Sequence, residues 1–206
     1  HPSMKPYIFG ERKGVHVIDL KETLHCLAGA LEFVSQVVTQ GGTILFIGMK
    51  EQIRGKVKEV GDSASMPYVN VKWIGGTITN WQIIKRQILK LKKAREEKEK
   101  SEWAKYTKKE QVLLQRNLDK LENFYAGIAS LEKMHDALFI IDCKESKTAI
   151  REAHVKNIPI IALCDTNVDV RKIAYPIPAN DDAVRSLQLL LDAINATILQ
   201  ARAQKN

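Results

Sequence analysis

The stretch TILFIGM, Thr43 to Met49, decides the fold of this chain. It is apolar at almost every position, so both faces of a strand formed here would be buried. Strands of this kind are typical of a parallel sheet that helices cover on both sides. The flanking segments agree, because Lys21 to Val38 has apolar residues at helical spacing and a further helix is expected from Lys50 to about Val60.

The same alternation of strand and helix recurs along the chain. Further helices are predicted at Thr148 to Lys156 and in the C-terminal segment. Further strands are predicted at VHVIDL (15–20), YVNVKW (68–73), ALFIID (137–142), PIIALCD (159–165) and YPIP (175–178). Short apolar strands separated by helices predict an α/β fold with a parallel sheet flanked by helices.

The middle of the chain differs from both halves. Residues 82–124 contain 13 Lys/Arg and 7 Asp/Glu, so most of the net charge of +8 lies there. Leucines recur at helical spacing toward its end, and Thr107 with Glu110 forms a capping-box pattern. We expect two antiparallel helices, and the sequence therefore divides into an α/β domain (1–79 and 131–206) and an inserted coiled-coil hairpin (80–130).

Composition narrows the possible partners. A net charge of +8 and an isoelectric point near 9.3 are typical of proteins that bind nucleic acid or an anionic surface. The three cysteines are widely separated and show no metal-binding spacing, which favours reduced thiols and no metal site. No apolar run approaches the roughly 20 residues that a membrane helix needs, so no membrane partner is expected.

The sequence lacks the usual motifs of catalytic and nucleotide-binding sites. Gly48 and Gly55 are too far apart for a phosphate-binding loop, and no serine nucleophile motif is present. Asp142 and Asp165 end two predicted strands, where an α/β enzyme would place acid/base or magnesium-binding carboxylates. Aspartates at strand ends also form turns and caps, and this interpretation is favoured. No catalytic residue, cofactor or small-molecule substrate is therefore expected.

The basic residues near aromatic side chains indicate RNA. Lys5, Arg12 and Lys13 flank an aromatic N-terminal segment, while Lys72, Lys85 and Arg86 lie around the stretch KWIGGTITNW (72–81). Lysine and arginine neutralise phosphates, and nearby aromatic rings can stack on bases. A solvated helix face is the alternative explanation for a run of charge.

KWIGGTITNW also resembles the RWLGG-LTNW signature of the bacterial-type small-subunit ribosomal protein S-two family. Other segments match that family in the same order, over nearly the whole chain. They are KPYIFGERKGVHVIDL (5–20), ILFIGMK (44–50), KLEN (120–123), DALFIID (136–142), AIREA (149–153), NIPIIALCDTN (157–167) and IPANDDA (177–183). Thr77-Ile78 replaces the usual Met-Leu of the signature, a change that concerns local geometry.

The resemblance implies a flavodoxin-like, doubly wound parallel sheet with a projecting coiled-coil hairpin. It implies a non-enzymatic protein that binds small-subunit rRNA and neighbouring ribosomal proteins, including the large mRNA-binding protein. The location implied is the ribosome of the cytoplasm, with a plastid ribosome as the other possibility. Carried over by position, the candidate rRNA-binding residues are Lys5, Arg12, Lys13, Lys72, Trp73, Gly75, Gly76, Thr79, Asn80 and Trp81, to which the charge pattern adds Lys85 and Arg86.

Within the signature, we expect Lys72 and the polar turn to face RNA while the tryptophans hold them in place. Two rival functions remain open at this point. One is a nucleotide- or metal-dependent α/β enzyme or regulator that uses Asp142 and Asp165, since doubly wound sheets carry many functions. The other is a protein scaffold whose hairpin binds a coiled-coil partner.

Overall fold

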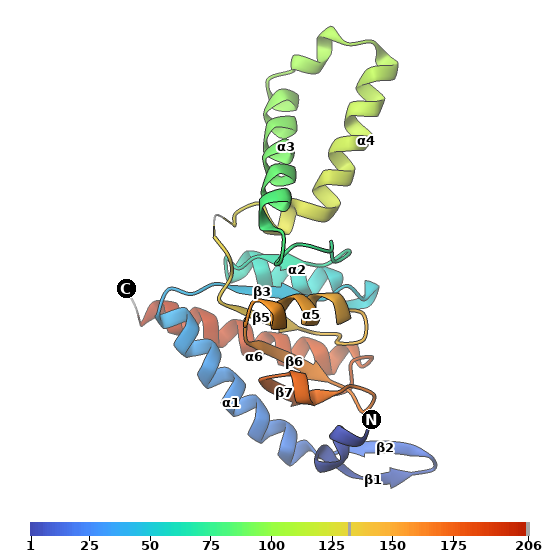
Figure 1. The fold of residues 1–206 in the computed structure, drawn as a ribbon, viewed down its shortest axis with the longest axis vertical. Coiled ribbons are helices and arrows are strands. Elements are labelled where there is room, and N and C mark those ends of the chain that lie inside the picture. The colour runs from blue at the N-terminus through green and yellow to red at the C-terminus, as the bar shows by residue number, and fades with distance from the viewer. Residues whose placement is uncertain (132, 205–206) are drawn as a thin grey trace.

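The computed structural model describes residues 1–131 and 133–204 (Figure 1). Five parallel strands form the central sheet in the order β4-β3-β5-β6-β7. Their bounds are Ile44–Ile47 (β3), Tyr68–Val69 (β4), Ala137–Ile140 (β5), Ile160–Cys164 (β6) and Tyr175–Pro178 (β7). This order reverses direction between β3 and β5, as in flavodoxin-like folds, so the predicted fold class is confirmed.

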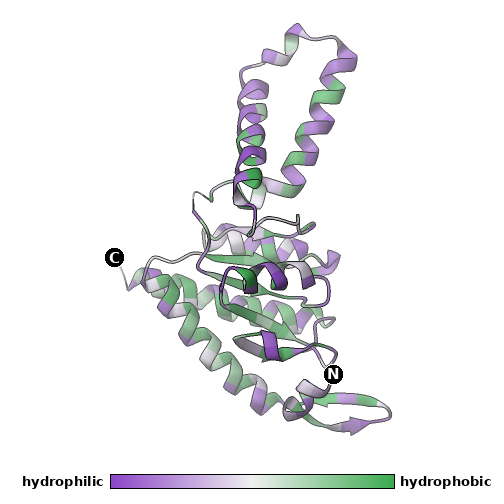
Figure 2. Cartoon of the chain, viewed as in Figure 1, coloured by the Kyte–Doolittle hydropathy of each residue, from purple (hydrophilic) through white to green (hydrophobic). Residues whose placement is uncertain are grey.

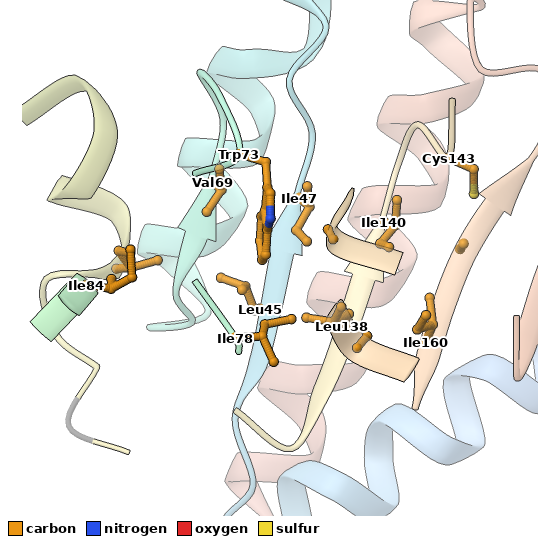
Figure 3. Close-up of a cluster of buried hydrophobic side chains, with 14 of the residues drawn as sticks. Leu45, Ile47, Val69, Trp73, Ile78, Ile84, Leu138, Ile140, Cys143 and Ile160 are labelled. Carbon is orange, nitrogen blue, oxygen red and sulfur yellow. The ribbon is translucent and has the colours of Figure 1, made fainter. Parts of the chain in front are cut away.

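Helices cover both faces of the sheet, which explains why its strands are apolar throughout. On one face lie α1 (Leu20–Thr39), α2 (Arg54–Ser63) and α6 (Val184–Ala203), which share a buried cluster with Phe46 and Phe139. The other face is covered by α5 (Lys147–Val155) and by the segment that follows β4. In Figure 3, Trp73 and Ile78 from that segment lie over Leu45, Ile47 and their neighbours on the strands.

The N-terminal segment forms a separate antiparallel ribbon and does not join the main sheet. A short 3-10 helix, η1 (Pro2–Tyr7), leads into β1 (Ile8–Arg12) and β2 (Val15–Ile18). Lys13 and Gly14 both have positive φ, which suits a two-residue hairpin turn with the twist of the strands. The predicted strand at 15–20 therefore exists, but the tight turn pairs it with its immediate neighbour and leaves Val15 and Val17 exposed.

The central segment forms the expected pair of antiparallel helices, α3 (Trp81–Glu99) and α4 (Lys108–Tyr125), which projects from the body (Figure 1). Figure 2 shows hydrophilic residues over most of the pair, interrupted by hydrophobic residues on both helices. Ile84, Ile88 and Leu118 belong to the same buried cluster as the sheet, so the root of the hairpin continues the core. The capping box of Thr107 and Glu110 is present, as predicted.

The second hairpin helix ends earlier than the expected residue 130. After Tyr125 the chain tightens into η4 (Ala126–Ile128), and Gly127 lies against the backbone of Tyr68 in β4. A Cβ atom at Gly127 would lie 2.2 Å from the Tyr68 carbonyl oxygen, so only glycine fits. This close contact ties the returning arm of the hairpin to the edge of the sheet. Among the helices of the described ranges, none has the length and apolar character to cross a membrane.

Candidate nucleic-acid interface

The KWIGGTITNW stretch leaves the sheet directly after β4. The predicted strand at 68–73 is only two residues long, Tyr68–Val69, because the chain then turns over the face of the sheet. Two turns follow: the Thr77 amide and hydroxyl both donate to the Ile74 carbonyl, and the Asn80 amide donates to the Gly76 carbonyl. Gly76 has a φ of +90°, a conformation that glycine adopts without strain.

The centre of this loop is a buried carboxylate, Glu152 of α5, which is 7% exposed. One of its oxygens accepts hydrogen bonds from the Trp73 indole at 3.0 Å and the Gly76 amide at 2.9 Å. The other oxygen accepts, each at 3.0 Å, from the Ile78 amide and from the amide and hydroxyl of Thr79. We call this arrangement the Glu152 clamp, and it fixes the loop onto the body at five points.

The electrostatics of the clamp follow from its donors. Burial opposes ionisation of Glu152, yet the hydrogen bonds from Trp73, Thr79, Gly76 and Ile78 outweigh it and lower the pKa of the carboxyl below its ordinary value. The charged form is therefore favoured although no lysine or arginine contacts it among the ion pairs of the described residues. The negative charge of Glu152 is stabilised by hydrogen bonds from neutral donors of a single loop.

The clamp divides the signature into an inward half and an outward half. Trp73 is 7% exposed and its N–H is used, and both Thr79 donors and the Gly76 amide point to Glu152. Trp73 is buried and its N–H binds Glu152, so it supports the loop from the inside, as expected of the tryptophans. Lys72, Gly75 and Asn80 are exposed, while Trp81 packs partly buried at the hairpin root.

The root of α3 continues this outward surface. Lys85 and Arg86 are exposed in the first two turns of α3, whereas Ile84 and Ile88 of the same turns are buried. In the parts of the chain that the structure describes, neither residue forms an ion pair, and neither does Lys72. Asn80, Lys85 and Arg86 therefore lie exposed at the base of the hairpin, whereas Lys72 is exposed near the carboxyl ends of the strands.

Lys72 also borders a cleft of about 740 Å³ at the carboxyl ends of the strands. Arg54, at the start of α2, also lines this cleft, and its Nε donates to the Met49 carbonyl at 2.9 Å. Nothing in the sequence pattern singles out Arg54, because an arginine that opens a helix is common. Its position in the same cleft as Lys72 depends on how α2 packs on the sheet.

The N-terminal candidates lie elsewhere. Arg12 and Lys13 are exposed at the tip of the β1–β2 ribbon, and Lys5 is exposed on η1. Figure 1 shows this ribbon at the end of the body opposite the hairpin. The predicted set of binding residues therefore forms two separate groups and not one continuous patch.

The strand-end carboxylates of the rival interpretation are engaged in structural contacts. Asp142 is 1% exposed, and its Oδ1 accepts from the amides of Lys144 and Glu145 at 2.8 and 3.1 Å, which shapes the turn after β5. Asp165 accepts from the amide of Thr166 at 2.6 Å. Among residues 1–131 and 133–204, no group of His, Cys, Asp and Glu is arranged to hold a metal ion.

A lysine occupies the point where the strand order reverses, which is the usual ligand position in such sheets. Lys50 Nζ lies 3.3 Å from Asp142 Oδ2, 2.9 Å from Asp181 Oδ1 and 2.8 Å from Asp182 Oδ1. We call these four residues the Lys50 cluster. Burial opposes the charge of Lys50, but hydrogen bonds to Asp182 and Asp181 raise its pKa above the ordinary value. The cluster joins the ends of β3 and β5 to the segment before α6.

A flavodoxin-like body with a basic hairpin and unpaired lysines at the hairpin root has the features of a protein that binds a polyanion. Comparison with known proteins makes this specific. The family model described as ribosomal protein S2 matches residues 1–201. The small ribosomal subunit protein uS2 of Coprothermobacter proteolyticus is 41% identical over 202 residues, which cover 98% of this chain and 75% of that protein. The uS2 protein of a Nitratiruptor species is 42% identical over 202 residues, covering 98% of this chain and 76% of its own.

The chain belongs to the ribosomal protein S2 family. Its function is that of a structural constituent of the small ribosomal subunit, and RNA binding and translation follow from this membership. The family resemblance found in the sequence is thereby confirmed, and the role is structural.

Proposed function

We propose that this protein is anchored to small-subunit rRNA through the outward half of its signature loop and the adjoining root of the hairpin. Lys72, Lys85 and Arg86 neutralise phosphates and release counterions, and the Asn80 amide supplies hydrogen bonds. The observation that carries this proposal is the Glu152 clamp. It holds the loop from the inside and leaves Lys72 and Asn80 exposed at a fixed position.

The proposal assigns different roles to the other candidate residues. Trp73, Gly76 and Thr79 position the loop, and Trp81 packs at the hairpin root. Gly75 is exposed, and a Cβ atom there would meet no atom within 4 Å, so its role is to leave room for the RNA backbone. Lys5, Arg12 and Lys13 form a second contact at the opposite end of the body.

Two units then serve one function: the α/β domain, 1–79 and 131–206, carries the loop, and the hairpin of residues 80–130 extends the contact. Neighbouring ribosomal proteins, the large mRNA-binding protein among them, are the other proposed partners. The exposed apolar side chains of the ribbon, including Phe9 at 78% exposure, support a protein contact there. The proposed location is the ribosome of the cytoplasm, with a plastid ribosome as the alternative.

The test is assembly into small subunits by the double variant Lys72→Glu/Arg86→Glu. Both side chains are exposed, so the variant should fold normally and show the same thermal unfolding as the parent protein. We expect weaker incorporation, with a difference in affinity from the parent that is largest at low salt and shrinks as the salt concentration rises in co-sedimentation. The matched control is Lys21→Glu/Arg185→Glu, which changes the same charge at exposed positions on α1 and α6.

Normal assembly of the folded Lys72→Glu/Arg86→Glu variant would overturn this assignment of the site. A thermal-shift screen with nucleotides tests the rival enzyme or regulator at the same time. Strong stabilisation by a nucleotide, with no binding to small subunits, would favour that rival over the structural role.

A further inference from the structure

A second basic surface lies on the body, on a side of α5 next to the one that faces the signature loop. It is a groove of about 330 Å³ between the start of α5 and the segment that follows β6. That segment contains a short 3-10 helix, η5 (Val170–Lys172). We call this feature the α5–η5 groove. Four cations line it: Lys144, Lys147, Arg151 and Lys172.

The cations lie on both walls of the groove. Lys147 and Arg151 are one helical turn apart on α5, and Lys144 precedes them in the turn after β5. Their spacing of three and four residues places them along one side of the helix, with Arg151 about 6 Å farther along the axis than Lys147. Lys172 faces them from η5. A line of positive charge on one wall and a cation on the other suit an extended chain of negative charges.

These charges have no protein partner within the described ranges. All four side chains are exposed, and none takes part in an ion pair there. The groove does contain a carboxylate, Asp169, but Arg171 binds it at 2.8 and 2.7 Å. The pKa of Asp169 falls to about 2, first through the hydrogen bond from Arg171, so this carboxylate stays charged and paired. The four cations of the groove therefore have no carboxylate of the groove left to pair with.

Both walls are fixed by hydrogen bonds. On one side, Asp142 accepts from the amides of Lys144 and Glu145 and so holds the turn that leads into α5. On the other, the Ser3 hydroxyl donates to the Val168 carbonyl at 3.4 Å and accepts from the Val170 amide at 3.2 Å. The buried side chains of Cys143 and Val168 form part of the floor. A groove with rigid walls loses little conformational entropy when an anion binds.

We propose that the α5–η5 groove is a second phosphate-binding surface for the RNA backbone. This proposal rests on the proposed function, because it adds a contact to the same class of partner. The recognised chemistry is a run of phosphodiester groups, and the contact carries no base specificity. RNA is favoured over an acidic peptide because the groove offers lysines and one arginine in a line, and the chain belongs to a ribosomal protein family.

The test measures the salt dependence of binding between the full chain and small-subunit rRNA. Each phosphate contact contributes about 0.7 to 0.9 to the slope of log K against log salt concentration. The variant Lys147→Gln/Lys172→Gln removes one charge from each wall, so the slope should fall in magnitude by about 1.5. Its effect should add to that of Lys72→Glu/Arg86→Glu, since the two surfaces are separate.

Two controls accompany this variant. Lys147→Arg/Lys172→Arg keeps both charges and should keep the slope of the parent protein. Lys21→Gln/Arg185→Gln removes two exposed charges on other helices and should also leave the slope unchanged. Thermal unfolding of each variant confirms that it folds, which is expected because the substituted side chains are exposed.

Three outcomes would contradict the proposal, and each identifies the assignment that fails. If the Lys147→Gln/Lys172→Gln slope equals that of the parent while the signature-loop variant loses slope, the groove proposal fails and the proposed function stands. If neither variant loses slope, both RNA assignments fail. If the groove variant binds rRNA normally but is lost from particles that contain the other ribosomal proteins, the groove is a protein contact and the RNA assignment is overturned.

Discussion

The Glu152 clamp and the Lys50 cluster hold a partly or fully buried charge in two different ways. Glu152 accepts hydrogen bonds from five neutral N–H and O–H donors of one loop, four of them within residues 76–79 and the fifth on Trp73. Lys50 is neutralised by three carboxylates from two separate segments. The clamp therefore sets the shape of a single loop, whereas the cluster ties distant segments together.

The difference has a functional consequence. The clamp turns donors inward and leaves cations outside, which suits a surface that contacts RNA. The cluster places a lysine and its carboxylates at the position where a doubly wound sheet would otherwise bind a ligand. One buried charge thus supports the signature loop, and the other joins the ends of β3 and β5 to the segment before α6. Three predictions test this contrast.

The largest effect is expected from Glu152→Gln. Glutamine has a single acceptor oxygen, and its NH2 group would face the amides that now bind the second carboxylate oxygen. Donors left unpaired in a buried site cost about 1–3 kcal/mol each, so we expect a loss of about 3 kcal/mol in the free energy of unfolding. Urea denaturation measures this loss, and rRNA affinity should fall with it because Lys72 and Asn80 lose their fixed position.

Glu145→Gln is the matched control for this substitution. Glu145 is exposed in the turn before α5, and its removal should change stability by less than about 0.5 kcal/mol. Equal losses in the two variants would show that the clamp contributes nothing beyond its charge.

A smaller loss is expected from Lys50→Met. Removing one partner of a fully buried ion pair costs about 3–5 kcal/mol, but here the lysine is partly exposed and Asp182 is largely exposed. Solvent screening lowers the expected loss to about 2 kcal/mol. The double variant Lys50→Met/Asp181→Asn should recover part of it, because Asp181 is a buried carboxylate that would otherwise lack its cation. Strictly additive losses in this double-mutant cycle would contradict the cluster as a coupled unit.

The smallest effect is a difference in the sign of the pH dependence. The pKa of Glu152 is lowered, so its stabilisation is complete above its ordinary value and is lost as the pH falls through the lower folded value. Burial raises the pKa of Asp181 despite Lys50, so its unfavourable charge is absent below the ordinary value and grows as the pH rises through the folded value.

Acidification from pH 7 toward pH 3 should therefore change the two variants in opposite directions relative to the parent protein. The deficit of Glu152→Gln should shrink, while the parent should gain stability relative to Asp181→Asn, by less than about 1 kcal/mol. Urea midpoints over this pH range measure both trends. Parallel curves for the two variants would mean that both carboxylates titrate as ordinary groups.

Much of the fold could be predicted because local pattern and tertiary structure agree. TILFIGM and ALFIID are apolar on both faces and became the central strands β3 and β5. The hairpin could be predicted from its charge and its leucine spacing, and the capping box of Thr107 marked the start of α4. The ribbon and the shortened β4 could not, because pairing partners and exit points depend on the surrounding packing.

The site was less predictable for the same reason. KWIGGTITNW drew attention through its tryptophans and glycines, but nothing in that stretch pointed to Glu152, which lies 79 residues after Trp73. A glutamate in a short helix gives no signal of its own. Lys50 likewise looked like the first residue of a helix, although its partner Asp181 is 131 residues away. Contacts across such separations are decided by the sheet order, which periodicity does not reveal.

The pairing of β3 with β5 also sets an order of events during synthesis. Thr43 and Asp136, at the start of these strands, are joined by a hydrogen bond across 93 residues, and the whole hairpin lies between them. The contacts between α3 and α4 are closer in sequence than this strand pair, and such contacts form faster. As the chain emerges from its N-terminus, the hairpin can therefore assemble before the sheet has its central pair. The projecting hairpin can therefore be complete while the α/β body that carries it is still partly synthesised.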